Sequence, residues 1–154
     1  MSMKAFWDRF STGRSTNTLT CTSCRTIIST TDDEFNELLL FFPQRHHDSD
    51  QDCTLEDLIA HYCETELIED YECNICKWQR MTLTKETAIT TCPPILCVVL
   101  CPTKQDGGII KSSVQFPVSG SNITEDDLQY NLVGIIHYTP CGSDHGHYTS
   151  ICCS

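Results

Sequence analysis

The chain has 154 residues, a formal net charge of −11 and twelve cysteines. Its length suffices for one hydrophobic core, and its acidic balance disfavours nucleic-acid binding, which needs concentrated Lys and Arg. No apolar run approaches the roughly 18 residues of a membrane span, and the first ten residues hold no apolar signal-peptide core. We therefore expect an intracellular protein of the cytoplasm or nucleus, neither secreted nor membrane-bound, with reduced thiols.

Two Cys-x-x-Cys pairs are the strongest chemical signal in the chain. Cys21 and Cys24 follow one strand-like segment, and Cys73 and Cys76 follow another. Four thiolates in two such pairs are typical of a tetrahedral structural zinc site. The pairs lie further apart than the roughly 15–20 residues of a simple zinc ribbon, so the metal would join two turns at the ends of a long intervening segment. Buried thiols or two disulfides are the alternatives.

The predicted elements place the cysteine turns at the tips of antiparallel ribbons. Residues 15–31 and 68–90 are expected to form these ribbons, with an apolar strand at 38–42 and a polar loop at 44–52 between them. The clearest helix follows the loop, where Thr54 and Asp57 fit a capping box. Its apolar stripe has helical spacing and consists of Leu55, Leu58, Ile59 and Tyr62.

After residue 90 the pattern is of strands and turns only. The apolar run 95–100 lies between two prolines and predicts a central strand buried on both faces. The remaining expected elements are a turn at 106–108, a polar loop at 119–127 and strands at 128–138 and 146–153. The sequence thus predicts a β-rich α+β fold with one helix, organised as a single unit over residues 1–154.

A second motif, Gly146-His147-Tyr148-Thr149, follows a turn at 139–144 near the C-terminus. Coming after a four-cysteine site, this hairpin resembles the C-terminal part of the ubiquitin-specific protease family of deubiquitinases. Other segments agree with that family in the same order: Cys21-Thr-Ser-Cys24 followed by Ser29, Glu34-Phe35 and Leu38-Leu39-Leu40; Thr54-Leu55-Glu56-Asp57-Leu58; Glu66-Leu67; Pro93-Pro94-Ile95-Leu96; and Val114-Gln115-Phe116-Pro117.

The resemblance implies a partial papain-like cysteine peptidase domain that binds ubiquitin and contributes to hydrolysis of ubiquitin–protein isopeptide bonds. A zinc-fingers region with an inserted strand and helix would span 15–90, and a partial palm 91–154. One structural Zn²⁺ would be held by the four cysteines. His147 would be the catalytic base that takes the proton of a cysteine thiol, while Gly146, which leaves room beside the histidine ring, and Tyr148 would contact substrate.

The chain departs from the family at two of three catalytic positions. It contains no Gly-Asn-Thr-Cys-type motif with the nucleophilic cysteine, and no Asp or Asn follows His147. We therefore expect the chain to be inactive alone and to need the missing half of the catalytic domain. The alternative is a non-catalytic, zinc-containing ubiquitin-binding or interaction module. Cys141, in the turn before His147, is not expected to replace the nucleophile.

Two further features have alternatives that stay open. The acidic runs at 32–34, 48–57 and 64–72 are either a solvated face or a rim for the basic tail of ubiquitin. His137 lacks a preceding glycine and is expected to be structural. The pair His46-His47 lies in the polar loop, and we do not expect it to form a second metal site.

Overall fold

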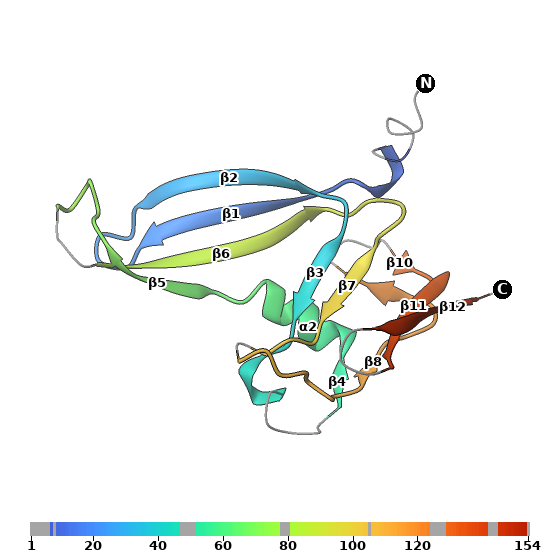
Figure 1. The fold of residues 1–154 in the computed structure, drawn as a ribbon. Coiled ribbons are helices and arrows are strands. Elements are labelled where there is room, and N and C mark those ends of the chain that lie inside the picture. The colour runs from blue at the N-terminus through green and yellow to red at the C-terminus, as the bar shows by residue number, and fades with distance from the viewer. Residues whose placement is uncertain are drawn as a thin grey trace. The chain divides into compact units, whose positions relative to one another are not determined.

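The computed structural model describes residues 7, 9–46, 52–77, 81–104, 106–123, 129–141 and 145–153. The chain divides into two compact units, residues 1–115 and 116–154, and each is described by itself. Strands predominate in both, as the sequence predicts (Figure 1). A single domain with fingers at 15–90 and a partial palm at 91–154 stays a prediction. No helix in the described ranges is long and apolar enough to cross a membrane.

The largest element of the first unit is a four-stranded antiparallel sheet, which we call the fingers sheet (Figure 1). Threonine and aliphatic residues recur along its strands, a composition that favours extended backbone. The two expected ribbons are present as the β1–β2 and β5–β6 pairs, joined through β1 and β6. In order across the sheet the strands are β2 (Ile27–Phe35), β1 (Gly13–Cys21), β6 (Met81–Thr91) and β5 (Glu66–Tyr71).

The acidic run on β2 has partners on the neighbouring strand. All three of its carboxylates pair with side chains of β1: Arg14 with Glu34 at 2.7 Å, Thr16 with Asp32 at 2.6 Å and Asn17 with Asp33 at 2.8 Å. These pairs are exposed, so each contributes at most about 1 kcal/mol. At 32–34 the acidic side chains therefore join two strands on a solvated surface.

A smaller layer of the first unit is built from the parallel strands β3 (Leu38–Phe41) and β7 (Val98–Cys101) and the helix α2 (Leu55–Tyr62). Leu38 and Leu40 are buried on the face that α2 covers, but Leu39 and Phe41 on the other face are 41% and 56% exposed. The prediction of a central strand buried on both faces is therefore wrong for β7. Among the described residues it pairs only with β3, and none of its side chains is fully buried: Val98, Val99 and Cys101 are half-buried and Leu100 is exposed.

The start of α2 agrees with the sequence. The Thr54 hydroxyl accepts a hydrogen bond from the Asp57 amide at 3.1 Å, and the Asp57 carboxylate accepts one from the Thr54 amide at 3.1 Å. This is the predicted capping box, and it lowers the pKa of Asp57, chiefly through the Thr54 amide. The neighbouring short elements are η1 (Gln44–His46), β4 (Cys53–Thr54) and β8 (Val114–Gln115), of which β4 and β8 pair in parallel.

The second unit holds two strand pairs, β9 (Ser121–Asn122) with β10 (Gln129–Tyr130) and β11 (Gly134–Pro140) with β12 (Gly146–Cys152). The strand expected at 128–138 is split between β10 and β11. The break follows from hydrogen bonds that replace the ladder: the Leu132 amide donates to Val118 at 2.9 Å, and the Asn131 side chain accepts from the Gly120 amide at 3.2 Å.

Candidate metal centre and histidine hairpin

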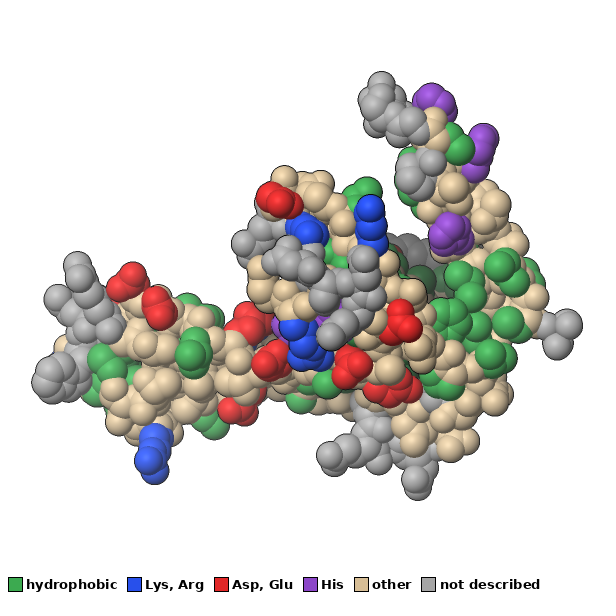
Figure 2. All heavy atoms as spheres, turned by 90° about the horizontal axis from the view of Figure 1, so that it is seen from below, with side chains coloured by type: hydrophobic (Ala, Val, Ile, Leu, Met, Phe, Trp, Pro, Cys, Tyr) green, Lys and Arg blue, Asp and Glu red, His purple; other side chains and the backbone are tan. Residues whose placement is uncertain are grey.

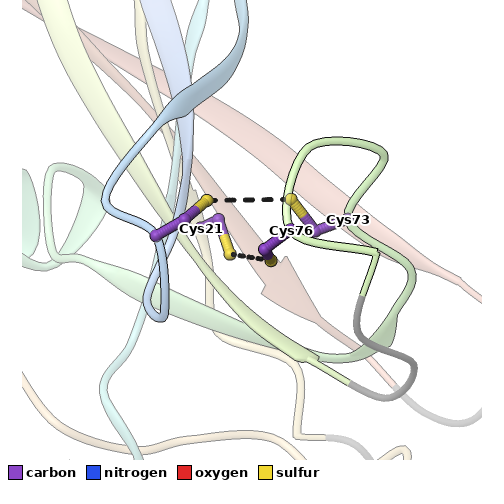
Figure 3. Close-up of side chains that lie close together, drawn as sticks. Cys21, Cys73 and Cys76 are labelled. Carbon is purple, nitrogen blue, oxygen red and sulfur yellow. Dashed lines mark hydrogen bonds between the residues drawn. The ribbon is translucent and has the colours of Figure 1, made fainter.

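The four predicted zinc ligands lie together in the first unit. Their sulfur atoms are all within 4.8 Å of one another. Cys21 Sγ lies 3.9 Å from Cys76 Sγ, and Cys24 Sγ lies 3.9 Å from Cys73 Sγ (Figure 3). A Zn–S bond of about 2.3 Å gives a tetrahedron with sulfur–sulfur edges of about 3.8 Å, whereas a disulfide needs about 2.05 Å. The spacing suits a single metal ion better than a disulfide.

The two cysteine turns have the same backbone geometry despite different sequences. In each, the amide of the residue after the second cysteine donates to the carbonyl of the first: Arg25 to Cys21 and Lys77 to Cys73, both at 2.8 Å. Arg25 and Lys77 have φ angles of 55° and 53°, in the left-handed region. This region costs a non-glycine residue of the order of 1 kcal/mol, and it turns each chain back around its pair of sulfurs.

Irregular pairing accompanies both turns. The β1–β2 register shifts between Leu19 and Thr20, beside the first turn. The β5–β6 register shifts between Ile68 and Tyr71, just before the second turn, where Asp70 has a φ of 58°. A β-bulge bends its strand and redirects the side chains that follow. The two bulges thus lie where the strands must aim their cysteines at each other.

Hydrogen-bond donors around the sulfurs favour thiolates. The pKa of Cys24 is lowered to about 6, mainly by the hydroxyl of Thr26 and then by its amide. The pKa of Cys73 is also lowered, first by the amide of Cys76 and then by that of Ile75. The thiolate is the form that binds metal ions. Sequence reasoning missed Thr26, because only the three-dimensional turn brings a residue beyond the Cys-x-x-Cys motif back to the sulfur.

The cluster is enclosed by the fingers sheet. Cys21 and Cys73 are fully buried together with Leu83, whereas Cys24 and Cys76 are half-buried. The surrounding apolar side chains are Leu19, Ile28, Ile68, Tyr71 and Met81. Four sulfur donors fill a tetrahedral shell and leave no position for substrate, which is typical of a structural rather than a catalytic site. The cluster could hold a metal ion, and its donor set fits zinc.

The other eight cysteines do not add to this cluster in the described ranges. All twelve cysteines are described, and no disulfide joins any of them. Burial raises the pKa of Cys53, Cys63 and Cys101, which keeps these thiols protonated. They behave as small apolar side chains of the first unit.

The Gly-His-Tyr motif lies at the start of β12 in the second unit. Across the β11–β12 ladder His147 is opposite Thr139, Tyr148 is opposite Tyr138 and Gly146 is opposite Pro140. Because side chains alternate along a strand, His147 shares a face with Thr139, and Tyr148 and Tyr138 share the other. Both faces of β12 are largely exposed, and Figure 2 shows histidine side chains grouped on this hairpin.

Two contacts order the polar face and the tip of the hairpin. The Thr139 hydroxyl lies 3.2 Å from Nδ1 of His137, and the Cys141 amide donates to the His145 carbonyl at 2.9 Å. Cys141 is exposed. His147 is exposed as well, so its ring is accessible from the face that it shares with Thr139.

The opposite face of the hairpin holds an aromatic pair that sequence reasoning missed. The rings of Tyr138 and Tyr148 have centroids 4.9 Å apart and are tilted by 46°. The ring of Tyr138 also occupies the space into which a Cβ atom at Gly146 would point. An aromatic residue placed diagonally from a glycine across a hairpin is the sequence signal for such a contact.

Comparison with known proteins agrees with this architecture. Residues 4–154 match the family described as ubiquitin carboxyl-terminal hydrolase. No curated protein sequence matches the chain. Among solved structures, the yeast SAGA DUB module with a mutant Sgf73 contains a chain with a TM-score of 0.74 and 21% identity, over 94% of this chain and 33% of that chain.

Two further solved structures give the same result. The SAGA Ubp8/Sgf11/Sus1/Sgf73 DUB module bound to ubiquitin aldehyde has a TM-score of 0.70 at 19% identity, over 94% of this chain and 34% of that chain. The module bound to monoubiquitin has a TM-score of 0.71 at 22% identity, over 94% and 33%. The chain thus spans about a third of the length of these relatives and shares their fold. With nearly its whole length matched, it belongs to the ubiquitin carboxyl-terminal hydrolase family and has the strand-rich fold of the ubiquitin-specific protease deubiquitinases.

Proposed function

We propose that this chain forms the fingers and part of the palm of a cysteine-type deubiquitinase that hydrolyses ubiquitin–protein isopeptide bonds. The family match over residues 4–154 is the observation that carries the proposal. The fingers region spans 15–90 and contains nearly all of the fingers sheet with its four sulfurs, and the partial palm spans 91–154 and contains the β11–β12 hairpin. The protein acts inside the cell, in the cytoplasm or nucleus.

His147 is the base of the proposed reaction. Its exposed ring takes the proton of a cysteine thiol supplied by the rest of the catalytic domain, and the thiolate attacks the isopeptide carbonyl. The imidazolium then returns the proton to the leaving lysine amine. Tyr148, which is 74% exposed, and the backbone at Gly146 contact the ubiquitin tail. Since the sequence holds neither the nucleophile motif nor an orienting Asp or Asn after His147, the chain alone does not catalyse this reaction.

The four cysteines hold one structural Zn²⁺. Bound there, the ion would supply no chemistry at the reaction centre but would join the two turns at the end of the fingers sheet. Lowered pKa values at Cys24 and Cys73, together with the burial of Cys21 and Cys73, support this assignment.

Ubiquitin is the proposed partner, and solved relatives bound to ubiquitin aldehyde and to monoubiquitin support it. A second candidate function is a non-catalytic ubiquitin-binding or interaction module. The observation in its favour is that the fingers sheet and its cysteine cluster lie entirely within one compact unit, residues 1–115. Without the rest of the catalytic domain the contact area is small, so we expect a Kd no tighter than about 10–100 µM.

The test combines an activity assay with a binding experiment on the zinc-loaded full chain. The chain alone should not cleave a fluorogenic amide at the ubiquitin C-terminus, and turnover abolished by Cys141→Ala would show that Cys141 is a nucleophile after all. A ubiquitin titration followed by NMR should shift signals of the fingers sheet and of the β11–β12 hairpin. No shifts at millimolar ubiquitin, with the chain folded, would reject the binding module and leave the incomplete enzyme.

A further inference from the structure

Gly146 is a glycine for reasons of space. Its φ angle is not in the left-handed region, so the backbone there does not itself require glycine. A Cβ atom at this position would overlap atoms Cζ, Cε2 and Oη of the Tyr138 ring. The missing side chain therefore makes room for a ring of the same hairpin, on the face that Tyr138 shares with Tyr148.

The backbone next to His147 has few bonds of its own on one side. Gly146 lies opposite Pro140 in a row of the ladder without cross-strand backbone hydrogen bonds, because the Cys141 amide donates to the His145 carbonyl in the next row and hydrogen-bonded rows alternate. Beyond it the Cys141–His145 hydrogen bond of 2.9 Å closes the turn. The Tyr138 ring covers Gly146 and packs on Tyr148, with 4.9 Å between centroids.

We propose that Tyr138 is a positioning residue for His147. Its ring holds Gly146 in place from one face of β12, so that the next residue presents its imidazole on the opposite face, beside Thr139. Substrate then approaches His147 from the Thr139 face, because the chain's own ring fills the space over Gly146 on the other. This inference rests on the proposed function, in which His147 is the base.

Amide hydrogen exchange at His147, followed by NMR in the full chain, tests the proposal. In Tyr138→Ala we expect exchange to accelerate by about tenfold, the size of one well-packed aromatic contact. Tyr138→Phe should restore the wild-type rate, since the ring and not the hydroxyl makes the contact. Ile136→Ala is the matched control, because Ile136 lies two residues away on the same face and is 77% exposed. It should change the rate by less than about twofold.

A double-mutant cycle tests the contact itself. Gly146→Ala should accelerate exchange at His147 in the wild-type background, because the new methyl group displaces the ring. In the Tyr138→Ala background it should have little effect, because the space is then open. If Tyr138→Ala abolishes the hairpin signals, the same cycle is run with Tyr138→Leu, whose side chain is shorter and can move aside.

Three results would overturn the proposal. They are an unchanged His147 exchange rate in Tyr138→Ala, failure of Tyr138→Phe to restore it, and an equal effect of Gly146→Ala in both backgrounds. All measurements are made without ubiquitin. A negative result therefore leaves the proposed function standing. Absence of ubiquitin binding would reject only the binding module and would leave the ring–glycine contact intact.

Discussion

The fingers sheet and the β11–β12 hairpin are both antiparallel, but different contacts stabilise them. The sheet has four strands, a buried cluster of Cys21, Cys73 and Leu83 at one end and polar cross-strand pairs along β1 and β2. The hairpin has two strands, and its Ile136, Tyr148 and Ile151 side chains are 77%, 74% and 60% exposed. One region thus has its own core, and the other leaves large apolar side chains open.

This difference separates the part that holds its own structure from the part proposed to carry the catalytic histidine. A two-stranded hairpin is marginally stable in water unless a further layer covers it. Under the proposed function, the rest of the catalytic domain supplies that layer and the nucleophile together. The fingers sheet has its own buried cluster and, under the same proposal, a metal ion, so the two regions should respond differently to loss of the sulfur ligands.

Loss of one sulfur should have the largest effect. We expect Cys73→Ser to lose the bound zinc and to lower the unfolding temperature markedly, since structural zinc contributes on the order of 10 kcal/mol to coupled binding and folding. Elemental analysis and thermal unfolding are the measurements. Cys97→Ser is the control, because Cys97 is exposed and outside the cluster. Equal zinc content in both variants, or reduced wild-type protein without zinc, would contradict the assignment.

Removal of the metal by a chelator should affect the fingers sheet but not the β11–β12 hairpin. NMR signals of the fingers sheet around the cysteine turns should broaden or shift, because the four sulfurs all lie in the first unit. Signals of β11 and β12 should stay in place, since no described residue of that hairpin belongs to the cluster. Equal changes in both regions would show that the hairpin depends on the metal and would break the comparison.

Acidification should weaken metal binding in a defined direction. The pKa of Cys24 is lowered from 9.0 to about 6, so its thiolate stabilises the folded chain, fully so above the ordinary thiol pKa. This stabilisation is lost as the pH falls through about 6, where protons compete with the metal for the sulfur. We expect the zinc affinity to fall by at least about tenfold per pH unit between pH 7.5 and 5.5.

The donor responsible for the lowered pKa can be removed. Thr26→Val deletes the hydroxyl that lowers the pKa of Cys24 most, so zinc should be lost at a higher pH than in the wild type. Thr22→Val is a matched control, because the Thr22 hydroxyl donates to the Thr82 carbonyl at 2.8 Å and not to a sulfur. Competition titrations with a colorimetric zinc chelator measure both, and identical pH profiles for the two variants would rule out a specific effect of Thr26.

Local patterns predicted much of this structure. The capping box at Thr54 and Asp57, the two antiparallel ribbons and the β-rich fold could be inferred because each depends on residues close in sequence or on strand periodicity. The family could be inferred because its motifs occur in order along the chain. Zinc as the bound metal and His147 as the base remain predictions.

Long-range packing was not predictable in the same way. The apolar run of β7 indicates a strand that prefers cover on both faces, but the sequence does not say which segment covers it. The break at residues 131–133 depends on hydrogen bonds to Val118 and Gly120, which no periodicity reveals. The left-handed backbone of Lys77 was also hidden, because glycine is the usual signal for such a position.

The smallest predicted effect concerns these left-handed positions. Lys77→Gly should stabilise the chain by about 0.5–1 kcal/mol, because glycine relieves the strain at a φ of 53° by more than it adds freedom to the unfolded state. Glu86→Gly is the control, since Glu86 is an exposed residue within regular β6, where glycine should destabilise by a similar amount. Chemical unfolding of the zinc-loaded chain measures both. A destabilised Lys77→Gly would mean that the lysine charge beside the sulfur cluster matters more than backbone strain. The bound metal would then impose the geometry of the two turns, which would not be present before binding.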